Sequence, residues 1–244
     1  MLTFGHIYNI GRTLLSKLGL DPTYRKIFAI GFNKTATKSI DAVFAQAGLV
    51  SIHRTLWRSS NHPLIHWPYQ AFSDGRPDDF ARLDRRFPKA LFILNTRDLG
   101  DWLDSRLEHY RHQRSKGTRP DYHAHRPTIE AVSSWIVERN HHHAAVLRYF
   151  AETTERLLVI NYIREPDAAR QIAAFVGGRP PAERPHIRSL ATGRKDGILV
   201  NRELIEATFA ALGVPPEEWN NDLLCPSLGD VDGLPADTRE LSIA

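Results

Sequence analysis

The sequence contains very little cysteine, which limits how the protein can be stabilised. Its 244 residues include a single cysteine, Cys225, so no disulfide can form within the chain. The lack of an oxidised framework is typical of proteins in a reducing compartment, and we therefore predict a cytoplasmic location. We interpret Cys225, which lies in the C-terminal tail, as a passive residue and not as a reactive thiol.

Long apolar runs are also missing. No uninterrupted stretch approaches the roughly 18 residues of a membrane span, and the first 20 residues are too polar for a signal peptide. We expect residues 1–24 to form an amphipathic helix packed on the body of the protein, with peripheral contact to a membrane surface as the alternative. Its apolar residues are Phe4, Ile7, Ile10, Leu14, Leu15 and Leu18.

Acidic residues are concentrated at the C-terminal end. The chain carries a net charge of +4, but residues 214–244 hold seven acids and one arginine, so residues 1–213 carry +10. This excess attracts anions such as phosphate, sulfate or an acidic substrate. The cations are not interleaved with aromatic residues as in nucleic-acid-binding segments, so we do not expect nucleic acid as a partner.

Short apolar runs alternate with amphipathic segments along the chain. This alternation predicts an α/β fold with a mainly parallel central sheet and helices on both faces. Strands are expected at residues 26–31, 49–52, 90–95 and 157–160. The chain is interpreted as one domain with an N-terminal helix, a cofactor-binding core and a C-terminal segment that ends in the acidic tail, at residues 1–24, 26–178 and 179–244.

A polar loop follows the first expected strand and enters a helix. In α/β proteins this position places backbone amides and the helix dipole where an anion can bind. The loop differs from an NTPase phosphate-binding loop, because the spacing from Gly31 to Lys38 is one residue too long and Ala36 occupies the second glycine position. Its residues are Asn33, Lys34, Thr35, Ala36, Thr37, Lys38 and Ser39.

This loop resembles the 5′-phosphosulfate loop of sulfotransferases that use 3′-phosphoadenosine 5′-phosphosulfate (PAPS). Such loops have an early lysine, then threonines, and a serine that enters the helix. The chain differs from that pattern at Asn33, Ala36 and Lys38. A second part of the resemblance is Arg97, which follows a later strand, with Ser105 eight residues further on. The resemblance covers about residues 26–178 and implies a P-loop-like sulfotransferase architecture.

The resemblance also implies roles for these residues. Lys34 would donate to the oxygen between the sulfuryl group and the leaving phosphate, and Asn33 to Ser39 would hold the 5′-phosphosulfate. Arg97 and Ser105 would bind the 3′-phosphate. PAPS would be the co-substrate and no metal would be required, because a sulfuryl group carries less negative charge than a phosphoryl group.

The acceptor must lose a proton, and two residues are candidates for the base. His53 follows the second expected strand and has a pKa suited to the task, while Asp74 lies before a turn. The basic segment 111–128 is a hypothetical lid for a polar or anionic acceptor, which could be a glycan, a lipid-linked molecule or a small molecule. Arg194 and Lys195 are a weaker candidate contact to the 3′-phosphate.

Other interpretations of the sequence remain. An atypical P-loop nucleotide kinase would use Lys38 and Ser39, and a non-catalytic nucleotide-binding protein would have the same fold. The run His141–His143 is expected on a solvated helix face, because consecutive helical residues point in different directions and cannot converge on one metal ion. The sequence does not indicate an oligomeric state.

Overall fold

The structure is a computed structural model that describes residues 2–59, 61–115, 127–187 and 201–229. The chain forms two compact units. Unit 1 comprises Met1–Thr96 and Glu152–Ile187, and unit 2 comprises Arg97–Ala151 and Arg188–Ala244. The expected core, residues 26–178, contributes to both. Arg194, Lys195, most of the hypothetical lid and the end of the acidic tail lie outside the described residues.

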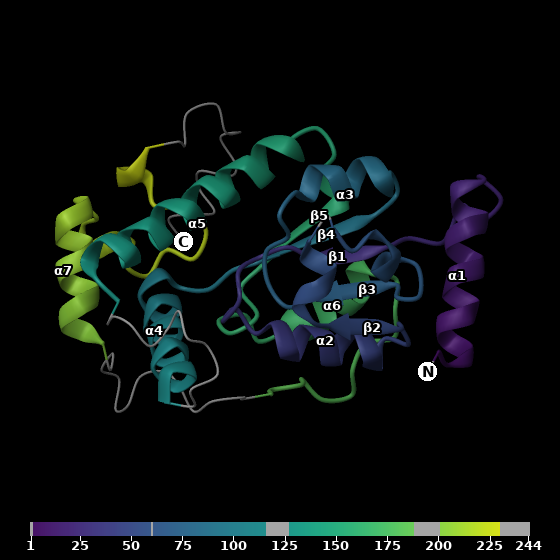
Figure 1. Ribbon diagram of the computed structural model, residues 1–244, viewed down its shortest axis with the longest axis horizontal. Coiled ribbons are helices and arrows are strands. Elements are labelled where there is room, and N and C mark those ends of the chain that lie inside the picture. The colour runs from purple at the N-terminus through teal and green to yellow at the C-terminus, as the bar shows by residue number, and fades with distance from the viewer. Residues whose placement is uncertain (1, 60, 116–126, 188–200, 230–244) are drawn as a thin grey trace. The chain divides into compact units, whose positions relative to one another are not determined.

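Unit 1 contains a five-stranded, all-parallel sheet, which confirms the predicted α/β fold (Figure 1). The strand order is β2-β3-β1-β4-β5. Three of the expected strands appear where the apolar runs placed them, and β2 begins two residues later than expected. The strands are β1 (Ile27–Ala29), β2 (Ser51–His53), β3 (Ala71–Ser73), β4 (Leu91–Asn95) and β5 (Leu157–Ile160).

Alternate residues of the central strands pack into two different layers, because successive side chains of a strand point to opposite faces. Ile27 and Ala29 join the aliphatic core with α2 (Thr37–Gln46) and α6 (Ala168–Phe175). Phe28 points the other way and stacks on Phe72 and Phe92, with ring centroids 4.8 and 5.6 Å apart.

Short helical turns cover this aromatic face. The 3₁₀ helices η1 (Thr55–Arg58) and η2 (Pro63–His66) supply Trp57 and His66, whose rings pack against Phe28 and Phe72. The helix α3 (Phe80–Arg86) is followed by Phe87, whose ring completes the aromatic layer. The sheet is therefore buried on both faces, as a parallel sheet requires.

The sequence analysis did not identify β3. Its three residues are Ala, Phe and Ser, a run too short and too mixed to predict a strand. In the structure β3 inserts between β2 and β1 and pairs in parallel with both. All three of its residues are buried, so tertiary packing and not local propensity forms the strand.

The N-terminal helix α1 (Phe4–Lys17) is present and lies beyond one end of the strands (Figure 1). However, only Ile10 of the apolar residues that the sequence analysis identified is half-buried, and the other five are exposed. Its buried residues are Asn9 and Thr13, whereas Phe4 and Ile7 are exposed. The helix therefore presents its polar face to the rest of unit 1 and its apolar face to solvent.

Unit 2 is helical. It contains α4 (Leu99–Ser115), α5 (Ile129–Tyr149) and α7 (Arg202–Leu212). Asp104 of α4 is buried and accepts hydrogen bonds from both the amide and the side chain of Asn201 at the start of α7, at 2.8 and 2.6 Å. This pair of hydrogen bonds ties α4 to α7.

One expectation about unit 2 is wrong. The run His141–His143 is not wholly solvated, because His142 and His143 are buried and the His143 ring is hydrogen-bonded to the carbonyl of Leu223 at 2.6 Å. Cys225 is fully buried, and its amide donates to the side-chain oxygen of Asn140. Burial raises the pKa of the Cys225 thiol to about 11, which agrees with its interpretation as an inert residue.

The aromatic layer predicts a large loss of stability when its central ring is removed. Phe28→Ala should lower the free energy of unfolding by about 3–5 kcal/mol, because Phe28 is fully buried among other rings. Chemical denaturation measures this loss. Leu64→Ala is the control, since that side chain is 77% exposed and should change stability by less than about 0.5 kcal/mol. Equal losses in the two variants would contradict this packing.

Candidate functional site

The candidate site lies at the carboxyl ends of β1 and β4. These strands are neighbours in the sheet, but β2 and β3 lie on one side of the pair and β5 on the other. The chain thus leaves β1 and β4 in opposite directions, which is the arrangement where open parallel sheets bind ligands. The loop from Gly31 to Ser39 follows β1, and Asn95 ends β4.

Asn95 connects this loop to the sheet. The Gly31 amide donates to Asn95 Oδ1 at 3.0 Å, and Asn95 Nδ2 donates to the hydroxyl of Thr35. Thr35 Oγ1 in turn donates to the carbonyl of Phe32 at 2.5 Å. A Cβ atom on Gly31 would lie 2.0 Å from the carbonyl oxygen of Asn95, so only glycine fits there. Thr35 therefore stabilises the loop through its hydroxyl.

Two residues of the loop have a left-handed backbone conformation just before α2 begins. Lys34 has a φ of 70° and Ala36 a φ of 63°. Ala36 is the N-cap of α2 and supplies no side-chain hydrogen bond to the first turn. Turns of this kind, directly before a helix, direct backbone amides toward a common point and favour anions. Ala36 keeps the conformation that glycine prefers, although glycine is absent.

The other residues of the loop differ in exposure. Thr37 and Ser39 are buried, whereas Asn33 and Lys34 are half-buried and Lys38 is exposed. The hydroxyl oxygen of Ser39 accepts a hydrogen bond from the amide of Ile187 at 3.0 Å. Gly75 approaches the loop from β3, since a Cβ atom there would lie 3.4 Å from the Asn33 amide.

The structure brings together the two candidate bases. His53 ends β2, Asp74 follows β3, and the parallel pairing of these strands places His53 Nε2 3.5 Å from Asp74 Oδ1. The other ring nitrogen, Nδ1, is 3.0 Å from the hydroxyl of Ser73, which lies 3.5 Å from Asp41. Asp74 has a φ of 104°, a strained conformation for a residue other than glycine.

The surroundings of His53 favour a neutral ring. Burial lowers the pKa of His53 below its ordinary value of 6.5, and the nearby cations Lys38 and Lys34 lower it further. Asp74 and Asp41 oppose this effect and raise the pKa. A histidine that is neutral at pH 7 can accept a proton, so the pair has the properties of a base and its orienting carboxylate.

The second pair of predicted residues belongs to unit 2. Arg97 follows β4 in the chain and precedes α4, and Ser105 is buried on α4. Burial lowers the pKa of Arg97, while the nearby acids Asp101, Asp98 and Asp104 raise it. The chain therefore places the two halves of the predicted site in different units.

Sequence reasoning did not assign a role to Arg139. This α5 residue is 1% exposed and donates to the carbonyls of Arg97, at 3.0 Å, and Asp222. Its guanidinium also lies over the Trp102 ring, 5.7 Å from the centroid. A lone arginine on an amphipathic helix gives no signal that distinguishes such a buried anchor from a solvated residue.

No protein-family model and no curated protein matches the chain. Among the described residues, no group of His, Cys, Asp and Glu side chains could hold a metal ion, and no helix is long and apolar enough to cross a bilayer.

The left-handed conformation of Ala36 leads to a prediction about stability. Ala36→Gly should raise the free energy of unfolding by up to about 1 kcal/mol, because glycine adopts this conformation without steric strain. Ala45→Gly is the control: it is an exposed residue of α2, where glycine should lower stability by about 0.5–1 kcal/mol. Both changes are measured by chemical denaturation, and a loss at position 36 equal to that at position 45 would contradict the loop conformation.

The environment of His53 leads to a second prediction. Its ring should titrate below pH 6.5 in an NMR experiment, and Asp74→Asn should lower this pKa further, because the carboxylate stabilises the imidazolium. Asp79→Asn, which changes a carboxylate that caps α3, should leave the titration of His53 unchanged. A pKa that rises in Asp74→Asn would contradict the arrangement of the pair.

Proposed function

We propose that the protein is a PAPS-dependent sulfotransferase that transfers a sulfuryl group to a hydroxyl or amine of a polar acceptor. One observation carries this proposal: the lysine-bearing loop after β1 approaches the turn that holds Asp74, because a Cβ atom on Gly75 would lie 3.4 Å from the Asn33 amide, and Asp74 in turn lies 3.5 Å from His53. In-line transfer of a sulfuryl group requires at least a loop that holds the donor anion and a base that removes the proton of the acceptor.

The loop would hold the 5′-phosphosulfate, and Lys34 would stabilise the charge that develops on the leaving phosphate. As the bond between the sulfur and the bridging oxygen breaks, negative charge builds up on that oxygen. A preorganised cationic donor at this point is typically worth roughly 3–4 kcal/mol. Thr35 is fixed by Asn95, so it would contribute its backbone amide and the shape of the loop.

His53 would remove the proton of the acceptor. The acceptor oxygen or nitrogen forms its bond to sulfur while its proton passes to the neutral ring, and Asp74 stabilises the imidazolium that results. The resemblance assigns Arg97 and Ser105 to the 3′-phosphate. It also leaves the acceptor open, with a polar or anionic small molecule or glycan as the expected class.

A magnesium-dependent kinase is less well supported by the residues at the loop. Such enzymes use a carboxylate near the end of a strand beside the phosphate loop. Here that strand ends in Asn95, whose amide nitrogen donates to Thr35 and whose oxygen accepts from Gly31. Both ends of the side chain are used in holding the loop, and neither supplies negative charge to a cation.

Binding of 3′-phosphoadenosine 5′-phosphate (PAP), the product nucleotide, tests the proposal. PAP at about 100 times its dissociation constant should stabilise the full chain by roughly 2.7 kcal/mol, a shift in Tm of roughly 5–10 °C. Lys34→Ala and Arg97→Ala should both reduce this shift. The surface variants Lys89→Ala and Arg202→Ala, one from each unit, should keep it.

The other nucleotides distinguish the alternatives. AMP, which lacks the 3′-phosphate, should give a smaller shift than PAP, and the difference should disappear in Arg97→Ala. A shift with Mg-ATP that exceeds the shift with PAP would support a kinase. If none of the three nucleotides shifts the Tm, the proposed cofactor class is wrong.

A further inference from the structure

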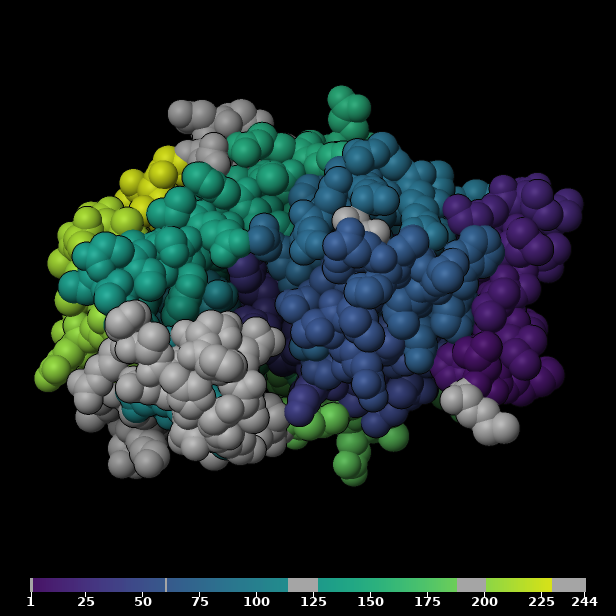
Figure 2. All heavy atoms as spheres, in the orientation of Figure 1, coloured from purple at the N-terminus to yellow at the C-terminus, as the bar shows by residue number. Residues whose placement is uncertain are grey.

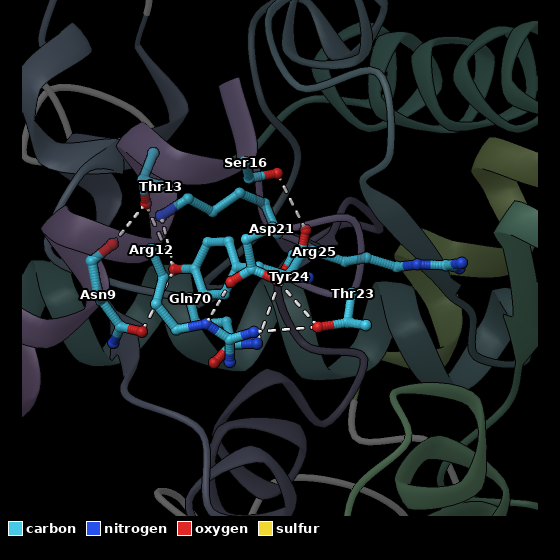
Figure 3. Close-up of polar contacts among 10 residues, drawn as sticks. Asn9, Arg12, Thr13, Ser16, Asp21, Thr23, Tyr24, Arg25 and Gln70 are labelled. Atoms are coloured by element: carbon cyan, nitrogen blue, oxygen red, sulfur yellow. Dashed lines mark hydrogen bonds and ion pairs between the residues drawn. The ribbon is translucent and has the colours of Figure 1, made fainter. Parts of the chain in front are cut away.

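The helix α1 contacts the rest of unit 1 through its polar side chains (Figure 3). Thr13 donates to the carbonyl of Trp67 at 3.3 Å, Asn9 to that of Pro68 at 3.4 Å, and Ser16 to that of Tyr24 at 3.3 Å. The Tyr24 hydroxyl donates back to Asn9 at 3.3 Å. These contacts use the segments that precede β1 and β3, so α1 lies at the amino ends of the strands, opposite the candidate site.

The opposite side of α1 carries exposed apolar side chains in two groups, one on each side of Gly11. Phe4 is 84% exposed, Ile7 59% and Leu14 50%. Spacings of three and seven residues place these side chains on one side of the helix. We call this surface the outward stripe; its members are Phe4, Ile7, Tyr8, Leu14, Leu15 and Leu18. Figure 2 shows α1 in purple as a ridge at the edge of unit 1. Several large apolar side chains exposed on one side of a helix indicate a contact with a membrane or another protein.

The charge around the stripe is positive. Residues 1–20 contain no Asp or Glu, and the cations Arg12 and Lys17 lie on opposite flanks of the stripe. Arg12 is held by an ion pair with Asp21 at 2.6 Å, whereas Lys17 donates to the carbonyl of Arg86 at 2.9 Å. An apolar stripe flanked by cations is typical of helices that lie in the interface of an anionic bilayer.

A cationic pocket adjoins the C-terminal half of α1. Its cavity of about 430 Å³ is bounded by Thr13 and Ser16 of α1 and by the segments before β1 and β4. Arg85 also makes an exposed ion pair with Asp79 at 3.5 Å. None of the described residues that line this pocket is acidic, and six are cationic: Lys17, Arg25, Lys26, Arg85, Arg86 and Lys89.

Lys26 is the buried cation of this pocket. Its side chain is 3% exposed, and its ammonium group donates to the Tyr24 hydroxyl and to the carbonyls of Trp67 and Tyr69, at 3.2, 3.3 and 2.6 Å. Among the described residues, none of its hydrogen-bond acceptors is a carboxylate. Burial, with Lys17 and Arg86 nearby, lowers the pKa of Lys26 to about 7. A bound anion would relieve this unfavourable concentration of positive charge.

We propose that α1 docks on the surface of an anionic phospholipid bilayer, with the outward stripe among the acyl chains and a lipid phosphate in the cationic pocket. The two features meet at α1, which carries the stripe and contributes Thr13, Ser16 and Lys17 to the pocket. A bilayer of anionic lipids supplies a partner for both, acyl chains for the stripe and phosphate for the cations. This surface is at the amino ends of the strands, so docking leaves the carboxyl edge of the sheet, where the candidate site lies, available to its ligands.

A second copy of the chain fits the surface less well than a membrane does. In a two-fold dimer the same patch meets itself, so the pocket and the flanking cations of one copy would face those of the other. Like charges brought together in this way oppose association. A bilayer that contains phosphatidylglycerol supplies negatively charged headgroups and an apolar interior together.

Vesicle flotation of the full chain tests the proposal. The protein should float with vesicles of phosphatidylcholine and phosphatidylglycerol in equal parts and remain in solution with phosphatidylcholine alone. Ile7→Glu/Leu14→Glu, in the stripe, and Arg25→Glu/Lys89→Glu, at exposed positions of the pocket, should each weaken binding by roughly tenfold or more. Leu64→Glu, at an exposed apolar residue elsewhere in unit 1, should bind like the wild type.

Three outcomes would overturn the proposal. The first is wild-type protein that does not float. If inorganic phosphate nevertheless raises its Tm, and Arg25→Glu/Lys89→Glu abolishes that shift, the pocket binds a soluble anion and not a lipid. The second is a dimer in sedimentation that Ile7→Glu/Leu14→Glu converts to monomer. The third is equal flotation of all variants. Each variant should keep the PAP shift, so failure of docking is distinguishable from failure of the proposed function.

Discussion

The candidate site depends on the side chain of Asn95. This fully buried amide uses both ends of its side chain to hold the loop after β1 against the end of β4, through the Gly31 amide and the Thr35 hydroxyl. The left-handed turns at Lys34 and Ala36 are strained for residues other than glycine, and they persist because the two ends of the loop are fixed. The shape of the loop after β1 thus follows from one neutral hydrogen-bonding group at the end of a neighbouring strand.

The fold follows largely from patterns that are visible in the sequence. The apolar runs around β1, β4 and β5 are continuous because a buried parallel strand is covered on both faces, and they identify these strands without tertiary information. β3 has no such run. Its residues Ala71–Ser73 form a strand because Phe72 fills a place between Phe28 and Trp57, and this is a property of the packed layer and not of the segment.

The site was predictable in part. The polar loop between β1 and α2 was predictable from the order of residues along the chain. The pairing of His53 with Asp74 was not, because it depends on β2 lying beside β3, and the sequence analysis did not identify β3. Arg139 and the inverted orientation of α1 were also unpredictable. In each case an amphipathic pattern shows that a helix has two faces, whereas only the tertiary structure determines which residues are buried.

The division of the chain has a consequence for the order of folding. The segment Arg97–Ala151 leaves unit 1 after β4 and the chain returns for β5, so neither unit is a continuous stretch of sequence. During synthesis the edge of the sheet beside β4 stays unpaired until residue 160 has been made, and the hydrogen bonds of Asp104 to Asn201 form only after residue 201. Pairings this distant in sequence form slowly. Each unit is therefore built from two separate stretches of the chain, and cleavage of a single peptide bond would not separate either unit intact from the other.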